Sequence, residues 1–407
     1  MEDTQLFQEI LGLKSPWIVS KINRNFEEKE LILTVSYPQI KVANCPQCEG
    51  ECPIYDYPNT RRWRHLDTMQ FKTFIEAQVP RIKCKEHGVV TIKVPWSEAK
   101  SRFTELFEKL AIDTLLACKN NTSACELLRL SWDEAELIKK KAVKRGLEKR
   151  NTENIEYLGI DEKSFLKGHD YATVLVDIEG RRVLDVERGR TEEAAKSVIN
   201  KSIKEEQKKS IKAVCADMWQ GFINAIAKEL PDSTVVHDVF HISKYLNEAV
   251  NKVRVQEDKE LSKEKNNSLK KSKWVWLKRE EKLTEKERTL FGTLLKGNFR
   301  VGKAYVIKEQ FKGIYSSQTI EQGKKYFSDW YELVIGSGIK SMIRVANMLR
   351  NRLEGVLNYI KNSITNGSSE GINSLIQGLK AIARGYRNFD NFRISILFHL
   401  GKLSLYP

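Results

Sequence analysis

The chain has 407 residues, a formal net charge of +15 and an ordinary apolar content. This length allows two or more domains with sizeable cores, and the composition is that of a globular rather than a disordered protein. The positive charge favours a polyanionic partner, with nucleic acid the first candidate and a ribosomal or membrane-surface role the alternative. No apolar run reaches the ~18–20 residues of a membrane span, and the acidic start MEDTQLFQEI lacks a signal-peptide core, so we expect a cytosolic protein.

Residues 1–98 contain most of the seven cysteines, together with prolines and short β-prone runs. An odd number of cysteines in a reducing compartment argues against a disulfide framework. The motifs CPQC and CKEH instead provide ligands at the short spacing of a structural zinc site. These ligand candidates are Cys45, Cys48, Cys84 and His87. Cys52 could replace His87, and free cysteines in a small β subdomain are the alternative.

The segment RRWRHLD lies between the two cysteine motifs, and we place it in the same zinc ribbon. Its arginines are Arg61, Arg62 and Arg64. They are candidates for contacts with DNA phosphates, and a solvated basic face is the alternative.

Residues 99–150 have a helical pattern that becomes increasingly basic. Ser123 with Glu126, and Ser131 with Glu134, each match the capping-box pattern at a helix start. They predict a short helix from about 123 and a longer helix from about 131, joined by a tight turn. This is the spacing of a helix-turn-helix motif.

The second of these helices has one apolar face and one basic face. The apolar face is predicted to hold Ala135, Ile138, Ala142 and Val143. Much of the rest is cationic: Lys139, Lys140, Lys141, Lys144 and Arg145. We expect these cations to contact DNA phosphates, and a merely solvated basic helix is the alternative.

Apolar strands and helices alternate over residues 151–250 in the order β-β-β-α-β-α-β-α. This order matches the ribonuclease-H-like fold, an α/β core with a mixed five-stranded sheet in which the first and fourth strands are neighbours. The first predicted strand ends at Asp161 and the fourth at Asp217, so the two carboxylates should lie side by side. Such a pair is costly without a cation, and Mg²⁺ prefers oxygen ligands of this kind. For Asp161 alone, an acid at a loop edge is the alternative.

The segment TNGSSEGINSLIQGLKAIARGYRNF at 365–389 predicts another helix, which follows a turn at Asn366-Gly367. Ser368 or Ser369 can cap this helix, and Glu370 lies in its first turn. Glu370 is our candidate for the third acid that a two-metal phosphoryl-transfer site needs. The predicted buried stripe is Ile372, Leu375, Ile376 and Leu379. Asn373 and Gln377 share another face with Glu370, and the helix continues into the candidate DNA contacts Lys380, Arg384 and Arg387.

These segments resemble the DDE transposases of bacterial insertion sequences, specifically the ISL-three family. The blocks LGIDEKSF, CADMWQGF, VHDVFHISKYLNEAVNKVR and NGSSEGINSLIQGLKAIARGYRNFDNFR are similar to its catalytic blocks, and the resemblance runs nearly end to end. It implies a zinc-ribbon-like DNA-binding domain at 1–98 and a helix-turn-helix domain at 99–150. It further implies a ribonuclease-H-like catalytic domain at 151–407, with an α-helical insertion at about 254–350. His87 is a departure, because the family's zinc head usually ends in a second cysteine pair.

The resemblance implies that Asp161, Asp217 and Glu370 form the DDE triad and hold Mg²⁺ or Mn²⁺. Asp238 and His241 are similar to an Asp/Cys-x-x-His element of several transposase families, which could position the scissile strand. A helix-capping acid and a buried histidine are the alternative reading of this pair.

The implied function is an insertion-sequence transposase. It would bind terminal inverted repeats and target DNA, cleave strands by a two-metal mechanism and carry out strand transfer. Two element ends must be held together, so a homodimer is expected, acting at the nucleoid in a bacterial cytoplasm. The rivals are a non-catalytic zinc and helix-turn-helix regulator derived from a transposase, and a structure-specific nuclease with the same fold.

Overall fold

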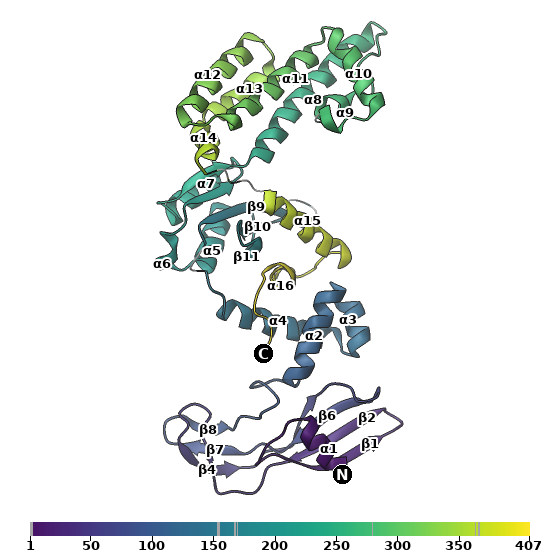
Figure 1. Cartoon of the computed structure of the whole chain (residues 1–407), viewed down its shortest axis with the longest axis vertical. Helices are drawn as coiled ribbons and strands as arrows, with labels where there is room; N and C mark the ends of the chain where they lie inside the picture. The colour runs from purple at the N-terminus through teal and green to yellow at the C-terminus, as the bar shows by residue number, and fades with distance from the viewer. Residues whose placement is uncertain are drawn as a thin grey trace. The chain divides into compact units, whose positions relative to one another are not determined.

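The computed structural model of the chain describes residues 3–152, 155–166, 168, 170–278, 280–362, 364 and 367–407, with the backbone alone at 368 and 369. Two compact units are present: unit 1 comprises Met1–Arg150 with Leu403–Pro407, and unit 2 comprises Asn151–Lys402 (Figure 1). Over the described residues, no helix is both long and apolar enough to cross a membrane.

In its described part, unit 1 contains two four-stranded sheets rather than one small ribbon. The first sheet has the order β1-β2-β6-β5, with β1 (Ile18–Asn25), β2 (Glu30–Ser36), β6 (Lys72–Ala77) and β5 (Arg61–Arg64). The second has the order β3-β4-β7-β8, with β3 (Val42–Asn44), β4 (Glu51–Asp56), β7 (Arg81–Cys84) and β8 (Gly88–Thr91). The RRWR segment is strand β5, which lies outside the sheet formed by β3, β4, β7 and β8. It pairs with β6 in the first sheet.

Tryptophans form the core beside the first sheet. The rings of Trp17 and Trp63 both meet Trp96 edge to face, with centroids 5.0 Å and 5.5 Å apart. Ile75 and Val35 pack in the same buried cluster. Aromatic pairs of this geometry add stability beyond the area that they bury.

The helices of unit 1 are α1 (Asp3–Ile10), α2 (Glu105–Cys118), α3 (Asn121–Leu128) and α4 (Trp132–Glu148). The capping box of Ser131 with Glu134 at the start of α4 is confirmed. The box predicted at Ser123 is wrong, because α3 begins two residues earlier and Asn120 caps it, accepting from the Ser123 N–H at 2.8 Å. Asn is as good an N-cap as Ser, so the capping pattern alone could not choose between the two starts.

Unit 2 is built on a sheet of five described strands in the order β11-β10-β9-β12-β13. Their bounds are β9 (Tyr157–Leu166), β10 (Asp170–Asp177), β11 (Arg182–Arg188), β12 (Ala213–Ala216) and β13 (Thr234–His237). Strands β9, β10 and β11 are antiparallel to one another, whereas β12 runs parallel to both β9 and β13. The predicted mixed α/β sheet, with its first and fourth strands adjacent, is confirmed.

Strand β9 was predicted to end at Asp161, but it continues to Leu166. The reason is its two different neighbours. The parallel partner β12 pairs only as far as Ile160, opposite Ala216. The antiparallel partner β10 pairs from Leu158 through Leu166, so it keeps the second half of β9 extended.

Helices cover both faces of this sheet (Figure 1). Leu158, Ile160 and Val214 face a buried cluster that includes residues of α5 (Glu192–Ser202) and α7 (Gln220–Glu229). On the other side, α14 (Leu353–Asn362) contacts β13, where the Asn358 side chain donates to the Val235 carbonyl at 2.9 Å. The remaining helices near the sheet are the short α6 (Glu205–Lys208), α15 (Gly367–Ile382) and α16 (Phe389–Leu400).

A helical segment follows the last strand and returns to the sheet at α14. Its helices are α8 (Val239–Lys263), α9 (Lys273–Leu277), α10 (Glu285–Lys296), α11 (Arg300–Gln310), α12 (Ile320–Gly336) and α13 (Lys340–Arg350). Short 3₁₀ turns lie at Glu280–Lys282 and Phe311–Ser316. Trp276 and Trp330 are buried in a core of their own with Val253 of α8. Helix α8 runs unbroken past residue 254, where the insertion was predicted to begin.

The end of the chain returns to unit 1, whereas the predicted catalytic domain ran to residue 407. The Arg145 guanidinium donates to the Leu405 carbonyl, and the Tyr406 hydroxyl donates to Asp113 at 2.6 Å. Leu403–Pro407 therefore belong to the packing of unit 1.

Candidate functional site

Three aspartates lie at the same level of three neighbouring strands of the unit 2 sheet. Ile160 of β9 is in register with Ala216 of β12, which is in register with His237 of β13. The next residue along the chain is an acid in all three cases: Asp161 within β9, and Asp217 and Asp238 directly after β12 and β13. All three are buried. Parallel register thus brings together carboxylates that lie far apart in the sequence.

The His241 imidazole lies among these three carboxylates. Its Nδ1 is 3.7 Å from Asp217, and its Nε2 is 3.7 Å from Asp161 and 3.9 Å from Asp238. His241 reaches this place because α8 starts at Val239, and Asp238 caps that helix by accepting from the Phe240 N–H at 3.1 Å. Asp238 therefore both caps the helix and belongs to the acidic cluster.

Burial and charge compete in setting the pKa values of this cluster. Burial disfavours the charged form of both Asp161 and His241, but their interaction outweighs it. The pKa of Asp161 therefore lies below its ordinary value and that of His241 above it. For Asp238, the effect of burial outweighs the hydrogen bond from the Phe240 N–H and the charge of His241, and its pKa is raised to about 6. Burial also raises the pKa of Glu370 on α15.

Helix α15 contacts β9 within unit 2. Its Asn373 side chain donates to Asp161 Oδ2 at 2.6 Å, and its Lys380 ammonium donates to the Ser164 carbonyl at 2.9 Å. Glu370 is half-buried one turn before Asn373, and its charge interacts with those of Asp161 and His241. The turn predicted at Asn366 and the caps predicted from the Ser368 or Ser369 side chain lie outside the described residues.

The buried stripe of α15 is largely as predicted. Ile372, Ile376 and Leu379 are buried, but Leu375 is 53% exposed, so its predicted burial is wrong. Arg384 and Arg387 follow on the exposed end of the segment.

Sequence reasoning missed two cations beside the aspartates. Arg190, in the loop before α5, lies 3.2 Å from Glu162 and 3.8 Å from Asp217. The Lys163 ammonium is 3.6 Å from Asp161. Lys163 could have been found, because it lies two residues from Asp161 on the same strand face. Arg190 gave no local signal, because its place depends on the pairing of β11 with β10.

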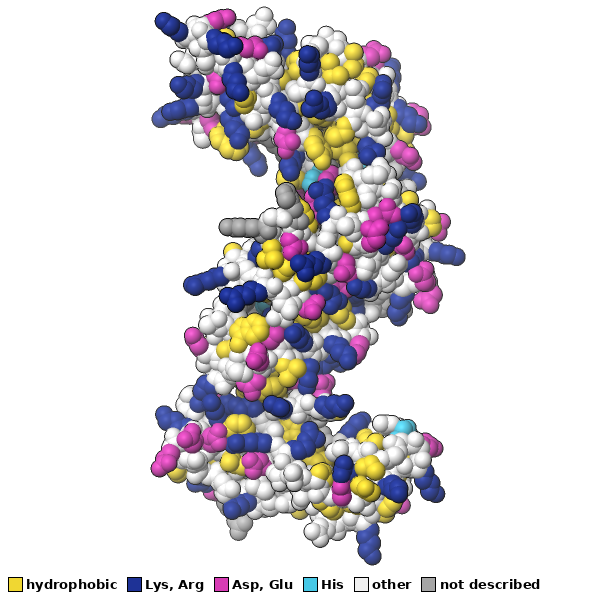
Figure 2. Space-filling view, turned by 180° about the vertical axis from the view of Figure 1, so that it is seen from behind, with side chains coloured by type: hydrophobic (Ala, Val, Ile, Leu, Met, Phe, Trp, Pro, Cys, Tyr) yellow, Lys and Arg dark blue, Asp and Glu magenta, His cyan; other side chains and the backbone are white. Residues whose placement is uncertain are grey.

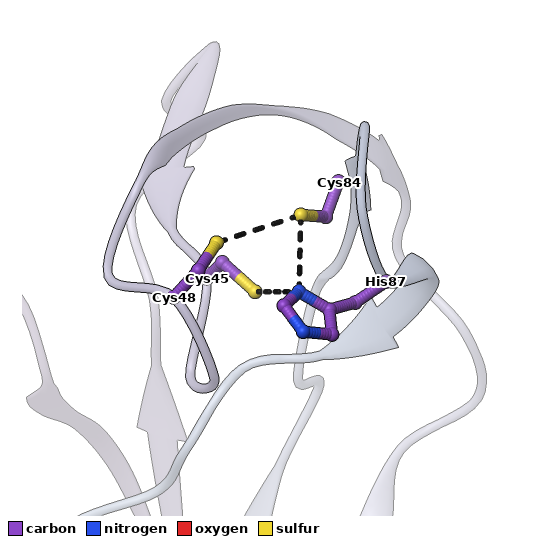
Figure 3. Close-up of side chains that lie close together, drawn as sticks. All are labelled: Cys45, Cys48, Cys84 and His87. Carbon is purple, nitrogen blue, oxygen red and sulfur yellow. Dashed lines mark hydrogen bonds between the residues drawn. The ribbon is translucent and has the colours of Figure 1, made fainter.

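A Cys/His cluster occupies one end of the second sheet of unit 1 (Figure 3). The ligand atoms of Cys45, Cys48, Cys84 and His87 all lie within 4.8 Å of one another. The closest pairs are Cys84 with His87 Nδ1 at 3.5 Å and Cys48 with Cys84 at 3.7 Å. Four ligands about 2.3 Å from a tetrahedral zinc are roughly 3.8 Å apart, so this cluster fits the size of a structural zinc site.

The thiols of the cluster differ in their electrostatics: the Gly50 backbone hydrogen bond lowers the pKa of Cys48, but the neighbouring Cys84 and Cys45 raise it to about 11. Hydrogen bonds from the His87 backbone and ring lower the pKa of Cys84 to about 6, which favours the ionised form that metals bind. Cys52 is buried nearby, but its thiol donates to the Gly50 carbonyl at 3.4 Å. The four-residue cluster contains His87 rather than Cys52.

The predicted apolar face of α4 is confirmed, because Ala135, Ile138, Ala142 and Val143 are all fully buried. Two of the predicted DNA-contacting cations are buried with it. Lys139 is 4% exposed and donates to Glu136 and Asn121, and Arg145 is 8% exposed and pairs with Glu98 and Glu108. Their predicted role in DNA contact is corrected, since both support the packing of unit 1.

Lys140 and Lys144 of α4 are exposed, and Lys141 is half-exposed. On β5, Arg64 is 6% exposed and bonds to the His65 and Thr73 carbonyls, so its predicted DNA contact is corrected in the same way. Arg62 is exposed but pairs with Glu30 and Glu76. Figure 2 shows further Lys and Arg side chains over the helical segment at the top of unit 2, with fewer acids among them.

The fold and these clusters define a class: a ribonuclease-H-like protein that also carries a zinc-ribbon module and a helix-turn-helix. Residues 158–396 match the transposase model of family ISL3. Residues 41–87 match the zinc-finger of transposase IS204/IS1001/IS1096/IS1165, and residues 92–136 match the helix-turn-helix domain of transposase family ISL3. The chain belongs to the ISL3 (ISL-three) family of transposases, which confirms the resemblance. A transposase with a helix-turn-helix domain binds DNA.

The chain is similar to named transposases, and the similarity covers nearly the whole length of each. The chain is 28% identical over 363 residues to the transposase for insertion sequence element IS1001 from Bordetella parapertussis, covering 88% of this chain and 89% of the relative. It is 25% identical over 420 residues to the transposase for insertion sequence element IS1557 from Mycobacterium tuberculosis, in strains CDC 1551 / Oshkosh and ATCC 25618 / H37Rv. In both strains 95% of this chain and 93% of the relative are covered.

Proposed function

We propose that the chain catalyses Mg²⁺-dependent cleavage and strand transfer at the ends of its insertion sequence, with Asp161, Asp217 and Glu370 as the catalytic acids. The observation that carries this proposal is the register of the sheet, because Asp161 and Asp217 directly follow the paired residues Ile160 and Ala216. Glu370 lies on α15, whose Asn373 is hydrogen-bonded to Asp161, and its charge interacts with that of Asp161.

The proposed ligands are carboxylates, whose oxygens are the donor atoms that a hard divalent cation such as Mg²⁺ or Mn²⁺ prefers. Beside them, buried acceptor atoms on Glu162 and Asn373 have no hydrogen-bond partner among the described residues. Burial raises the pKa values of Asp238 and Glu370, and a bound cation would favour the charged forms of both. Bound metal ions would lower the pKa of the attacking water and stabilise the charge on the leaving oxygen.

The chain's own cations have distinct tasks in this scheme. His241 balances the charge of Asp161, Asp217 and Asp238, and we assign Asp238 and His241 to positioning the scissile strand. Arg190 is anchored by Glu162 and lies beside Asp217, where it can hold a DNA phosphate against the acids.

The reaction has two phosphoryl-transfer steps at the same acids. Hydrolysis of a phosphodiester at each element end frees a 3′-hydroxyl, and this hydroxyl then attacks a phosphodiester of target DNA. No protein side chain forms a covalent intermediate. Because two ends must react together, we propose a homodimer in the synaptic complex.

We assign DNA binding to the N-terminal modules, with a zinc-ribbon-like domain at 1–98 and a helix-turn-helix domain at 99–150. We propose Cys45, Cys48, Cys84 and His87 as ligands of a structural Zn²⁺ that holds the second sheet together. Residues still proposed to contact phosphates are Arg61, Arg62, Lys140, Lys141, Lys144, Lys380, Arg384 and Arg387.

The proposal is tested with Asp217→Ala and a DNA substrate that carries the terminal repeat. The variant should bind this DNA with unchanged affinity but lose Mg²⁺-dependent nicking, because it removes a buried ligand without touching the N-terminal modules. Asp232→Ala, at an exposed aspartate of the same unit, should nick like the wild type. Normal nicking by Asp217→Ala would overturn the assignment of the acids. If the wild type binds this DNA but never nicks it with Mg²⁺ or Mn²⁺, the result would favour the alternative of a non-catalytic DNA-binding regulator.

A further inference from the structure

Asn373 connects two parts of the proposed catalytic site: helix α15, which carries Glu370, and Asp161 on strand β9. It lies on α15, one turn after Glu370, and its side chain donates to Asp161, 212 residues earlier in the chain. Residues three apart on a helix share a face, so the contact of Asn373 fixes the face of α15 on which Glu370 lies. We propose that Asn373 is a positioning residue that sets Asp161 and Glu370 relative to each other for metal binding, an inference that rests on the proposed function.

The hydrogen bond defines the orientation of the Asn373 amide. An ionised carboxylate only accepts hydrogen bonds, so the amide must direct its NH₂ group toward Asp161. Its carbonyl oxygen is then directed away from Asp161. That Oδ1 is buried and has no partner among the described residues, although the side chain is only 6% exposed. A buried acceptor without a partner is costly, and an ion or water at the site is the usual explanation.

The other contacts of Asp161 show why this hydrogen bond matters. Asp161 Oδ1 accepts from the Glu162 N–H at 2.8 Å and faces His241. Asp161 Oδ2 has Asn373 at 2.6 Å, whereas Lys163 is more distant at 3.6 Å. Without Asn373, the Asp161 carboxylate is free to rotate toward Lys163. Groups that orient metal ligands in this way typically change metal affinity by about 10–100-fold when they are removed.

Helix α15 has other anchors, so the effect of Asn373 can be separated from folding. Ile372, Ile376 and Leu379 are buried, and Lys380 donates to the Ser164 carbonyl. Asn373→Leu keeps the number and branching of the side-chain heavy atoms but removes both the donor and the acceptor. Gln377→Leu makes a similar change one turn later at an exposed position and serves as the control.

The measurement is a Mn²⁺ titration of the zinc-loaded, full-length protein without DNA, with free Mn²⁺ followed by electron paramagnetic resonance. We expect Asn373→Leu to weaken Mn²⁺ binding by about 10-fold or more. Gln377→Leu should bind like the wild type, and Asp161→Ala should lose the site. If Asp161→Ala abolishes binding but Asn373→Leu does not weaken it, the role of Asn373 is wrong. If Asp161→Ala binds Mn²⁺ like the wild type, the proposed catalytic metal site itself is wrong.

Asn373→Asp tests whether the side chain at position 373 faces the metal site. It keeps an acceptor oxygen but removes the donor and adds a second negative charge against Asp161. The metal-free variant should therefore melt at a lower temperature than the wild type, and Mn²⁺ should raise its melting temperature by more than it raises that of the wild type. A role in packing alone predicts equal Mn²⁺-induced shifts in both proteins, and that result would overturn the proposal.

Discussion

Two histidines of the chain have pKa values shifted in opposite directions because their neighbours differ. His241 is surrounded by carboxylates, which hold its pKa above the ordinary value despite burial. His65 is buried in unit 1, its ring nitrogen 2.9 Å from the Thr104 hydroxyl, and burial beside Arg64 lowers its pKa to about 4. The surroundings thus favour the charged form of the imidazole in one unit and its neutral form in the other.

The neutral state of His65 predicts a loss of stability in mild acid. The folded pKa of about 4 lies below the ordinary 6.5, so between these values the unfolded chain takes up a proton that the folded chain refuses. The free energy of unfolding should fall as the pH drops from 6.5 to 4, by at most roughly 3 kcal/mol from this group. Denaturant unfolding of wild type and His65→Asn across this range measures the effect, and parallel pH curves would contradict it.

At the scale of single residues, the sequence predicted the positions of the acids better than the surroundings of the cations. Asp161 and Asp217 could be placed together because strand pairing follows from apolar pattern and order. Lys139 and Arg145 were assigned to DNA because lysine and arginine are usually exposed, yet buried acids pair with both. Those acids come from Glu136 on the same helix and from Glu108 on another helix, and the second pairing is invisible without tertiary structure.

The zinc site gives a second test at single residues. Cys48→Ser should lose most of the bound zinc, because a serine hydroxyl does not replace a thiolate ligand, and unit 1 should melt at a lower temperature. Cys118→Ser is the control, since that cysteine lies on α2 outside the cluster. Mass spectrometry measures the zinc content of both variants. An unchanged zinc content in Cys48→Ser would refute the assignment of Cys48 as a zinc ligand.

At the scale of elements, local patterns predicted helix starts only where one cap dominates. Ser131 and Glu134 form a reciprocal box at α4, with the Ser131 N–H donating to Glu134 at 2.9 Å. At α3 the same pattern failed, because Asn120 offered an equally good cap upstream. The end of β9 failed for a different reason: its length is set by its partner β10 and not by its own residues.

The two serines provide a matched pair for testing helix capping. Ser131→Ala should lower the free energy of unfolding by about 1 kcal/mol, because the first turn of α4 loses the partner of the Glu134 N–H. Ser123→Ala should have almost no effect, since Ser123 is exposed inside α3 and does not cap it. Equal losses in the two variants, measured by denaturant titration, would show that the cap of α4 contributes little.

At the scale of the whole molecule, the sequence predicted the α/β core of unit 2 but not the architecture of the N-terminal region. The core was predictable because its strands and helices alternate in a recognisable order. Unit 1 instead pairs β2 with β6 in parallel across about 40 residues, and β3 and β4 of the other sheet lie between them in the sequence. Short β-prone runs indicate that strands exist, but they cannot show which distant strands pair.

The net charge of +15 predicts that phosphate contacts dominate DNA affinity. The logarithm of the binding constant should then fall linearly with the logarithm of salt concentration, with a slope of about −0.9 for each phosphate neutralised. Lys140→Ala removes an exposed cation of α4 and should reduce the steepness of this slope by about one, whereas Lys14→Ala, an exposed lysine after α1, should leave it unchanged. Fluorescence anisotropy with a terminal-repeat duplex at several salt concentrations gives both slopes. Equal slopes for Lys140→Ala and wild type would remove α4 from the DNA interface, and a wild-type slope near zero would argue against phosphate contacts altogether.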